Sequence, residues 1–513
     1  MQQESRVKKS LLNARVNLIF YFITLALSFF SRKIFLDYLG PDFVGLSGTL
    51  VNILGFLSLA EMGVGAAVSY NLYKPLQRGD KSQIEELVSV FGYLYRRIGT
   101  FVAFGGLAIS AFIPLLFKDS GFSLPLIFFA FYAILSSSLF SYFINYRQII
   151  LAADQRSYVA TIYLQSAVVV KTLLQMAAAY HWGNYYVWIA LEFGFGLLAC
   201  GILNWKIAQT YPWLDANIKK GKEAFPRHKK IIRFTKQIFV HKIKDFLLFQ
   251  SDQILVFVFV SLKMVAYYGN YTLITTKLTH LFSTFLGGFW ASVGNLVAEG
   301  DKEKTISVFW EIQSLYFIVS SITIYGIYHF LTPLITLWLG AEYILDHSIL
   351  ILLSIYSFLG QVRGAVDMYN GAYGQVGDTW AAIAEGVINI SVTLLTAPRW
   401  GIEGILLGKI FSVILMVIIW KPYYLFHGAL KQSVLLYWKE IARHMIVLCI
   451  AFGCGNLINK KLPIDAADGF GEWLFATLVS TILFCCILFS GLYIFCKGPK
   501  MLITRFQTYA LHH

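Results

Sequence analysis

Charged residues are scarce in this chain. They make up 14% of its 513 residues, against roughly 25% in an ordinary soluble domain. Hydrophobic residues, by contrast, account for 57% of the sequence. A soluble enzyme could not bury so much apolar surface with so few charges to cover it. The composition therefore excludes that class and indicates a polytopic membrane protein.

Cysteine is scarce too, and its spacing shows neither a metal site nor a disulfide framework. All six cysteines lie in or at the ends of apolar stretches: Cys200, Cys449, Cys454, Cys485, Cys486 and Cys496. We interpret them as small buried apolar residues. The sequence also lacks a P-loop, so ATP is not the predicted energy source. No catalytic residue, metal or cofactor is expected, apart from Na⁺ or H⁺ as a coupling ion.

Long apolar stretches fill most of the chain. A helix needs about 20 apolar residues to cross the hydrocarbon core. Fourteen stretches reach that length: 16–36, 44–70, 91–117, 123–150, 157–180, 186–207, 241–262, 264–298, 308–339, 343–373, 380–397, 401–425, 441–459 and 473–496. The predicted fold class is an all-α polytopic membrane protein with about fourteen transmembrane helices. The basic, then apolar, N-terminus is interpreted as a retained first helix, because no small-residue cleavage site follows it.

The net charge of +14 does not indicate nucleic-acid binding, because the basic residues lie between apolar spans. They concentrate in alternate connections, and eleven fall between Lys206 and Lys244. By the positive-inside rule these connections, and both termini, are predicted to be cytoplasmic. The stretch Lys229–Leu247 has apolar residues at helical spacing with basic residues between them. It fits either a solvated linker or an amphipathic helix on the anionic inner leaflet.

A stretch near the N-terminus has a fainter copy later in the chain. In segments 32–87 and 252–304, an apolar span runs into Gly-Asp-Lys, at Gly79 and at Gly300. Pairing Gly45 with Gly269 gives a separation of 224 residues, whereas the Gly-Asp-Lys loops are 221 apart. A three-residue insertion would reconcile the two. Helices 1–6 and 7–12 are therefore predicted to be parallel repeats.

This repeat predicts the domain organisation. The predicted parts are an N-terminal lobe (1–207), a basic cytoplasmic linker (208–240), a C-terminal lobe (241–425), and two extra helices with a cytoplasmic tail (426–513). Each lobe would hold six helices, so the two lobes would have the same topology in the membrane.

Ionisable side chains inside the apolar spans are the candidate functional residues. They are costly in hydrocarbon, so they pair with one another or line a hydrated path. Lys171 and Glu192 are expected at similar depth on consecutive helices, as a structural ion pair or as a polar cavity wall. Arg363 and Asp367 share one helix face at i, i+4, and Glu385 lies at similar depth on the next helix. These three fit either an internal pair or a hydrated vestibule.

The remaining candidates are isolated in the sequence: Glu61, Asp252, Lys277 and His280. Arg32 and Lys33 stand at the outer end of the first helix. Interfacial snorkelling explains these two cations, and attraction of phosphate is the functional alternative. The candidate carriers of a coupling ion are the four acids Glu61, Asp252, Asp367 and Glu385.

Three stretches carry diffuse patterns of Gly, Pro and charge. They are residues 31–76 (SRKIFLDYLGPDFVG onward), 144–159 (INYRQIILAADQRSYV) and 363–412 (RGAVDMYNGAYGQVGDTW onward). With these patterns the chain resembles the Wzx-type polysaccharide flippases of the multidrug/oligosaccharidyl-lipid/polysaccharide (MOP) exporter superfamily. The resemblance runs from about Arg15 to Pro422.

The resemblance implies a V-shaped, MATE-like pair of six-helix bundles. Helices 1, 2, 7 and 8 would line a cavity that opens alternately to either side of a bacterial cytoplasmic membrane. The implied cargo is an undecaprenyl-pyrophosphate-linked sugar repeat unit for O-antigen, capsule or exopolysaccharide. Implied partners are this glycan, membrane lipids and a polysaccharide polymerase complex, with no nucleic acid. Candidate substrate or cavity residues are Arg32, Lys33, Glu61, Lys171, Lys277, His280 and Arg363.

Other functions stay open. A flippase of the peptidoglycan precursor lipid II shares the implied fold, but its first helix carries charges deep in the cavity, and residues 17–31 here carry none. A cation-coupled multidrug exporter of the same superfamily usually has twelve spans and acids in its N-terminal lobe, so Glu61 and Glu192 keep it open. A non-transporting scaffold or a polymerase belongs to another class, and the short predicted outer connections disfavour the polymerase.

Overall fold

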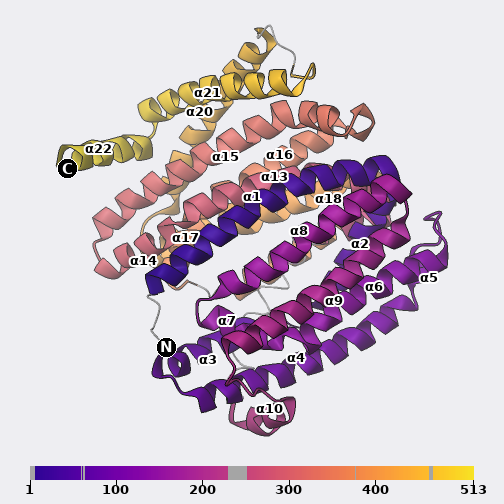
Figure 1. Cartoon of the computed structure of the whole chain (residues 1–513). Helices are drawn as coiled ribbons and strands as arrows, with labels where there is room; N and C mark the ends of the chain where they lie inside the picture. Colours follow the sequence, from indigo (N-terminus) through magenta and orange to yellow (C-terminus); the bar gives the residue numbers. More distant parts are fainter. Residues whose placement is uncertain are drawn as a thin grey trace. The chain divides into compact units, whose positions relative to one another are not determined.

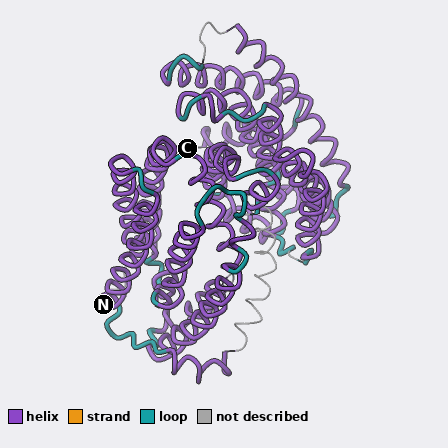
Figure 2. Tube along the Cα trace, turned by 90° about the vertical axis from the view of Figure 1, so that its right-hand side faces the viewer, coloured by secondary structure: helices purple, strands orange, loops and turns teal. Residues whose placement is uncertain are grey.

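The computed structural model describes residues 6–58, 61, 64–228, 251–375, 377–461 and 466–512. Within these residues the regular elements are all helices (Figure 2). Contacts between residues divide the chain into two units, 1–266 and 267–513. The described helices confirm the predicted all-α class. The predicted lobe boundaries, at residues 207 and 241, stay predictions.

Unit 1 is a bundle of long helices that pack side by side, with several short helices between them (Figure 1). Its helices are α1 (Arg6–Leu39), α2 (Pro41–Ser58), α3 (Val64–Arg78), α4 (Lys81–Ser110), α5 (Ile113–Leu116), α6 (Leu124–Phe143), α7 (Ile149–Ala153), α8 (Ser157–Trp182), α9 (Tyr185–Thr210), α10 (Ile218–Ala224) and α12 (Asp252–Phe259). Helix α1 packs along α8, α8 along α9, α9 along α6, and α6 along α4. The short helix α10 crosses α4 at one end of the unit.

Unit 2 continues from α13, which begins in unit 1. Its helices are α13 (Leu262–Gly287), α14 (Phe289–Glu299), α15 (Lys302–Trp338), α16 (His347–Val362), α17 (Gly364–Ala372), α18 (Thr379–Val413), α19 (Lys421–Leu425), α20 (Val434–Lys461), α21 (Phe470–Phe495) and α22 (Lys497–His512). Helix α15 is central: it packs on α16, α21 and α22. In α18, Gly401 has a φ of 54° and breaks the helix, so the residues before and after it form two helices.

Ten helical segments of the described residues are long and apolar enough to cross a membrane. The described parts of the predicted spans fall mainly on helices; residues 59–60 and 62–63 of the second span are not described, and the seventh is described only from residue 251 onward. The predicted eleventh and twelfth spans are the two parts of α18, on either side of Gly401, together with the helical turns up to Leu425. The predicted amphipathic helix at Lys229–Leu247 lies outside the described residues.

Small residues let the helices of unit 1 approach closely. Gly92, Gly99 and Gly106 recur at every seventh position of α4, and a Cβ at any of them would crowd Tyr146, Tyr142 or Leu135. This spacing keeps the three glycines on one stripe of α4, which faces α6 and the turn after it. In hydrocarbon, where apolar side chains gain little by leaving lipid, close backbone packing of this kind is a main source of helix association.

The predicted echo between the two segments has a matching local structure. Gly79 and Gly300 both have positive φ, 68° and 79°. The following aspartates, Asp80 and Asp301, cap the next helix by accepting a hydrogen bond of 3.0 Å from the backbone N–H three residues on. In both places the glycine ends one helix, because it adopts the left-handed conformation without a steric penalty from a Cβ. The aspartate begins the next helix, because its carboxylate accepts from a backbone N–H that has no partner within the helix.

The structure corrects the alignment of the echo. Helices α2 and α13 begin 221 residues apart (41 and 262), and so do α4 and α15 (81 and 302). The Gly-Asp turns have the same separation (79 and 300). The predicted three-residue insertion is therefore wrong: Gly45 corresponds to Ala266, not to Gly269. The two similar tripeptides that contain these glycines, Phe43-Val44-Gly45 and Tyr267-Tyr268-Gly269, therefore lie at different distances from the starts of their helices.

Gly45 lies where α2 meets the start of α13. A Cβ at this position would overlap the carbonyl oxygen of Leu262. Two turns further on, Asn52 donates a hydrogen bond of 2.8 Å to the Gln253 side chain of α12. The first of the two echoing segments thus packs against the beginning of the second, and all of these residues belong to unit 1.

In unit 2 a buried polar network joins α20 to α15 and α22. His444 donates from Nδ1 to the carbonyl of Glu440 at 2.7 Å, and its Nε2 accepts from the Ser314 hydroxyl at 3.2 Å. The backbone N–H of Lys497 donates to the Glu440 carboxylate at 2.8 Å, and Arg443 pairs with the same carboxylate at 3.0 Å. The network satisfies polar groups that would otherwise be costly to bury.

The close contact at Gly45 predicts a large effect of a single methyl group. Gly45→Ala should lower the melting temperature of the purified protein in detergent, because backbone cannot move aside as a flexible side chain can, and overpacking costs about 1–3 kcal/mol. Gly194→Ala is the control: Gly194 lies in α9 with nothing within 4 Å of an added Cβ, so alanine should keep or raise the melting temperature. Equal melting temperatures for the two variants would contradict the prediction.

Candidate functional site

Glu61 lies between α2 and α3 and is the centre of a small polar cluster in unit 1. Its carboxylate accepts hydrogen bonds from the hydroxyls of Tyr95 and Tyr142. Tyr142 also hydrogen-bonds to Ser58, the last residue of α2. The rings of Tyr95 and Tyr142 lie 5.6 Å apart. We call Ser58, Glu61, Tyr95 and Tyr142 the Glu61 cluster.

The Glu61 cluster joins three parts of the bundle. Tyr95 comes from α4, Tyr142 comes from the end of α6, and the acid comes from the link between α2 and α3. Two phenol donors can replace much of the hydration that a carboxylate loses on burial. The cluster can therefore hold the acid in place.

Lys171 and Glu192 form the ion pair that the sequence allowed. The ammonium of Lys171 on α8 lies 2.6 Å from the carboxylate of Glu192 on α9. Gln175, one turn along α8, donates to the other carboxylate oxygen at 3.1 Å. The pair is thus a bridge between neighbouring helices, with one carboxylate oxygen satisfied by each partner. A role in cargo binding stays a prediction.

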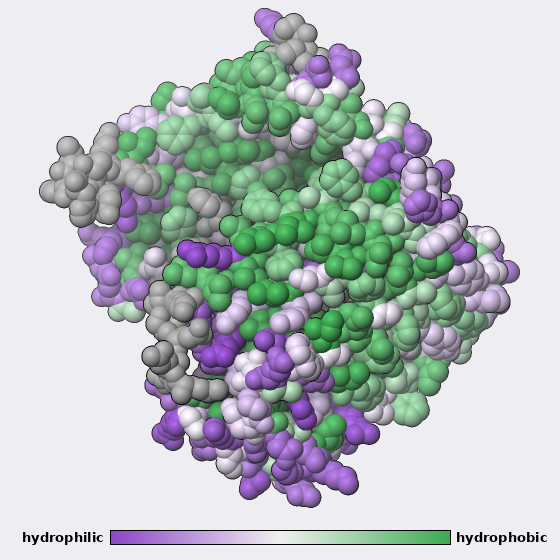
Figure 3. All heavy atoms as spheres, in the orientation of Figure 1, coloured by the Kyte–Doolittle hydropathy of each residue, from purple (hydrophilic) through white to green (hydrophobic). Residues whose placement is uncertain are grey.

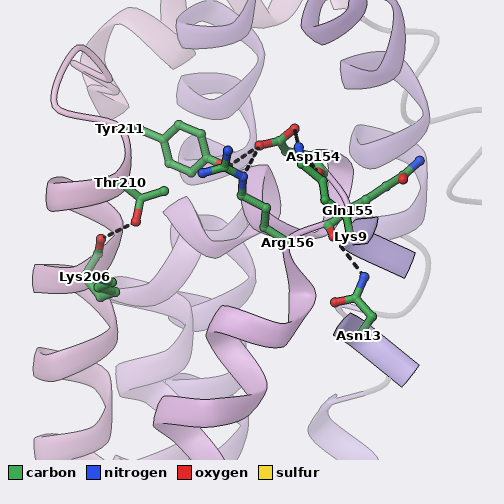
Figure 4. A network of polar contacts seen from close by, with 8 residues as sticks. All are labelled: Lys9, Asn13, Asp154, Gln155, Arg156, Lys206, Thr210 and Tyr211. Atoms are coloured by element: carbon green, nitrogen blue, oxygen red, sulfur yellow. Dashed lines mark hydrogen bonds and ion pairs between the residues drawn. The ribbon is translucent and has the colours of Figure 1, made fainter. Parts of the chain in front are cut away.

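A second polar network holds the other end of α8 in place (Figure 4). The carboxylate of Asp154 pairs with Lys9 of α1 at 2.7 Å and with Arg156 at 3.0 Å. It also accepts a hydrogen bond of 2.8 Å from the hydroxyl of Tyr211. We call Lys9, Asn13, Asp154, Arg156 and Tyr211 the Asp154 clamp.

The Asp154 clamp also satisfies the backbone at the start of α8. Gln155 takes a left-handed conformation, with φ of 59°, and its carbonyl accepts from Asn13 at 2.9 Å. The Asn13 oxygen accepts from the backbone N–H of Tyr158 at 2.6 Å, one of the donors that a helix start leaves unpaired. Burial and the negative charge of Asp154 raise the pKa of Tyr211, so its hydroxyl stays a neutral donor.

The predicted cluster of unit 2 is present in part. Arg363 and Asp367 form an i, i+4 ion pair of 3.2 Å. The pair spans the junction of α16 and α17, because Arg363 is the cap between these two helices. Glu385 is buried in α18, with 3% of its surface exposed. The hydrated vestibule that the sequence suggested here stays a prediction.

The other predicted residues lie on separate elements. Lys33 pairs with Asp37 at 3.2 Å on the surface of α1, and Arg32 is half-buried on the same helix. Asp252 is buried at the start of α12, with 7% of its surface exposed. Lys277 and His280 lie one turn apart on α13, half-buried and exposed respectively.

Several polar residues of these networks were missed from the sequence. Tyr95 and Tyr142 look like ordinary aromatic residues of apolar spans. Asp378 at the start of α18 is buried, and it pairs with Lys421 at 2.8 Å. Lys409 is a buried cation whose ammonium lies 4.3 Å from the centre of the Tyr356 ring. A charged residue inside an apolar span was the available signal for Lys409.

No protein-family profile matches the sequence, and no curated protein matches it. Solved structures do. The lipid II flippase MurJ in an inward closed conformation has a TM-score of 0.63 at 15% identity, over 93% of this chain and 99% of that one. An inward-facing multidrug resistance MATE family transporter of the MOP superfamily has a TM-score of 0.59 at 16% identity, over 82% of this chain and 99% of that one.

The chain thus shares its fold with this MATE family transporter and with the lipid II flippase MurJ. This confirms the predicted MATE-like architecture of a multi-pass membrane protein. Sequence identities of 15% and 16% do not identify the cargo. The cargo has to be inferred from the residues of the site.

The Glu61 cluster predicts a thermodynamic coupling. Glu61→Ala and Tyr142→Phe should each lower stability, and the double variant should lose less than the sum, because a hydrogen bond to a charged group contributes about 1.5–3 kcal/mol. Tyr132→Phe is the control, since this α6 tyrosine donates to Ser110 instead. Its loss of stability should therefore simply add to the loss caused by Glu61→Ala. Unfolding of the purified variants in detergent measures all of these. Additive effects of Glu61 and Tyr142 would contradict the cluster.

The Asp154 clamp predicts a charge-specific loss of stability. Asp154→Asn keeps the shape but leaves Lys9 and Arg156 without their carboxylate, so we expect a loss of about 1–3 kcal/mol and a lower melting temperature. Asp215→Asn is the control, because the Asp215–Lys220 pair of 2.9 Å is exposed to solvent and surface pairs contribute little. A clamp variant as stable as this control would show that the ion pairs contribute nothing.

Proposed function

We propose that this protein is a flippase for lipid-linked oligosaccharides. It would move undecaprenyl-pyrophosphate-linked repeat units from the cytoplasmic to the outer face of a bacterial cytoplasmic membrane, by alternating access, for O-antigen, capsule or exopolysaccharide synthesis. The cargo explains why a transporter is needed at all. A pyrophosphate and a sugar chain would lose their hydration in hydrocarbon without replacement.

The observation that carries the flippase class is the extent of the structural match. The MATE transporter and the lipid II flippase are each covered over 99% of their length, but they match 82% and 93% of this chain respectively. The chain thus has more helical structure in common with the lipid-cargo transporter. The helices α20 and α21, which follow the predicted twelve-helix core, are the spans that a twelve-span exporter is expected to lack.

Within the flippases, the first helix favours an oligosaccharide cargo over lipid II. Helix α1 carries no charged residue between Arg15 and Arg32, a length of several turns. The lipid II flippases are expected to place charges there. The cation-coupled multidrug exporter stays the alternative in another class, and Glu61 is its candidate carrier.

The assigned cargo-binding residues are Lys277 and His280 on α13. An ammonium and an imidazole can both donate to phosphate oxygens, and they lie one turn apart on a helix that the resemblance places at the cavity. Lys33, Lys171 and Arg363 each form an ion pair with a carboxylate.

Complementation tests the cargo. The gene should restore surface polysaccharide in a strain that lacks its own oligosaccharide flippase and is supplied with the cognate glycosyltransferases. It should not rescue growth of a strain depleted of its lipid II flippase. Rescue of the second strain alone would overturn the oligosaccharide assignment, and drug resistance without either rescue would favour the exporter.

The binding residue is tested in the same strain. Lys277→Ala should lower surface polysaccharide by about tenfold, the equivalent of one charge-assisted contact, at an unchanged amount of protein in the membrane. Lys302→Ala is the control, because this exposed lysine at the start of α15 should have no effect. Full activity of the Lys277 variant would exclude it from cargo binding.

A further inference from the structure

A pocket of about 320 Å³ lies between α4 and α10 in unit 1. Four of the seven residues that line it are cations, and the lining contains no acid: Tyr93, Arg96, Arg97, Thr100, Ile218, Lys219 and Lys222. The guanidinium of Arg97 lies 5.6 Å from the centre of the Tyr93 ring. The pocket thus combines two arginines, two lysines and the Tyr93 hydroxyl, all of which can donate hydrogen bonds to an anion, whereas the Thr100 hydroxyl already donates to the carbonyl of Arg96 at 2.8 Å.

The four cations have no carboxylate within ion-pair distance among the described residues. Two acids of this region pair with other groups. Glu86 pairs with His228 at 2.7 Å, and Asp215 pairs with Lys220 at 2.9 Å. Four like charges around one pocket repel one another, so the free pocket is electrostatically unsatisfied and an anion would stabilise it.

The pocket is built on a well-anchored platform. A Cβ at Gly221 of α10 would overlap the backbone carbonyl of Ser89, so α10 lies directly on α4. The backbone N–H of Asn217 donates to the Ser89 hydroxyl at 3.0 Å, and the rings of Tyr93 and Phe225 are 5.5 Å apart. The backbones that carry the cations are therefore held in place before any ligand arrives, which lowers the entropic cost of binding.

The pocket lies where the surface of α4 changes from charged to apolar. Beyond Arg96 and Arg97, the exposed side chains of α4 are Phe101, Phe104 and Leu107, each more than half exposed. Hydrophilic residues gather around α10 at the lower end of unit 1, and the surface above them is largely hydrophobic (Figure 3). This is the arrangement of a membrane–water interface, where basic residues meet headgroups and aromatic residues meet acyl chains.

We propose that this pocket binds the phosphate headgroup of an anionic phospholipid. The two arginines present paired donors to phosphate oxygens, the lysines add charge from α10, and the apolar face of α4 receives the acyl chains. The positive-inside pattern puts the pocket on the cytoplasmic leaflet, where a bound lipid would fasten α10, and the linker that follows it, to the membrane. The inference does not depend on the cargo of the proposed flippase.

Native mass spectrometry of the full chain in detergent tests the proposal. The protein is titrated with phosphatidylglycerol or with zwitterionic phosphatidylcholine. Two charge-neutralised double variants, R96Q/R97Q and K219Q/K222Q, are compared with the control K74Q/R78Q, which removes two exposed cations from α3 in the same unit. Inorganic pyrophosphate is added as a competitor, to separate a lipid headgroup from a soluble anion. Melting temperatures confirm that the variants are folded.

The wild type and K74Q/R78Q should bind phosphatidylglycerol at least tenfold more tightly than phosphatidylcholine. Each pocket variant should bind phosphatidylglycerol about thirtyfold more weakly, since each of its two lost cations contributes of the order of 1 kcal/mol, and higher salt should weaken binding. If K74Q/R78Q lost as much affinity for phosphatidylglycerol as the pocket variants, binding would arise from diffuse charge attraction, and the proposed binding pocket would be wrong. Binding of pyrophosphate without a preference between the two lipids would overturn the lipid assignment.

Discussion

The cost of burying charge in an apolar fold controls how this bundle is held together. An isolated ion in hydrocarbon must be paired, be hydrogen-bonded or reach water. Glu192 meets this demand with a lysine and a glutamine of α8. Asp154, in the connection before α8, is held in a similar way by two cations and a tyrosine hydroxyl. Because both acids take partners from other helices, the contacts that stabilise the charge also fix the neighbouring helices.

The same device occurs in both repeats. An acid stands before the fifth helix of each: Asp154 before α8 and Asp378 before α18. Each pairs with a lysine from another helix, Lys9 at 2.7 Å and Lys421 at 2.8 Å. The lysine belongs to the first helix in one case and to the end of the last helix in the other, so the acid is paired in both repeats but its partner comes from a different helix. Glycines of positive φ, Gly183 and Gly401, also follow the fifth helix in both.

Helix positions were predictable from the sequence because their signal is local. An apolar run of bilayer length has few alternatives to a helix, and a Gly-Asp pair between two such runs defines a turn. The alignment of the repeats was not predictable in the same way. It depended on Gly45 and Gly269, whose equivalence required knowing where α2 and α13 begin. Gly79 and Gly300 align the two repeats more reliably than a glycine inside a helix does, because each of them marks the end of a helix.

The partners of the charges were harder to predict, because they come from distant parts of the chain. Lys171 and Glu192 could be paired from the sequence, since one short turn joins their helices. The tyrosines of the Glu61 cluster could not, because Tyr95 and Tyr142 carry no signal that separates them from the many other aromatic residues. The basic pocket was also missed, although Arg96 and Arg97 are consecutive cations inside a predicted span and therefore require an explanation.

The two repeats differ at two of the candidate functional positions. At the constant separation of 221 residues, Glu61 corresponds to Phe282, and Lys277 corresponds to Phe56. An acid held by two tyrosines is thus specific to the first repeat, and a cation is specific to the second, while the turns and caps around them are shared. Caps and close glycine contacts preserve a common skeleton because they involve backbone. Side chains that take no part in these backbone contacts can differ between the repeats. Functional residues are therefore best sought at positions where the two repeats carry different side chains.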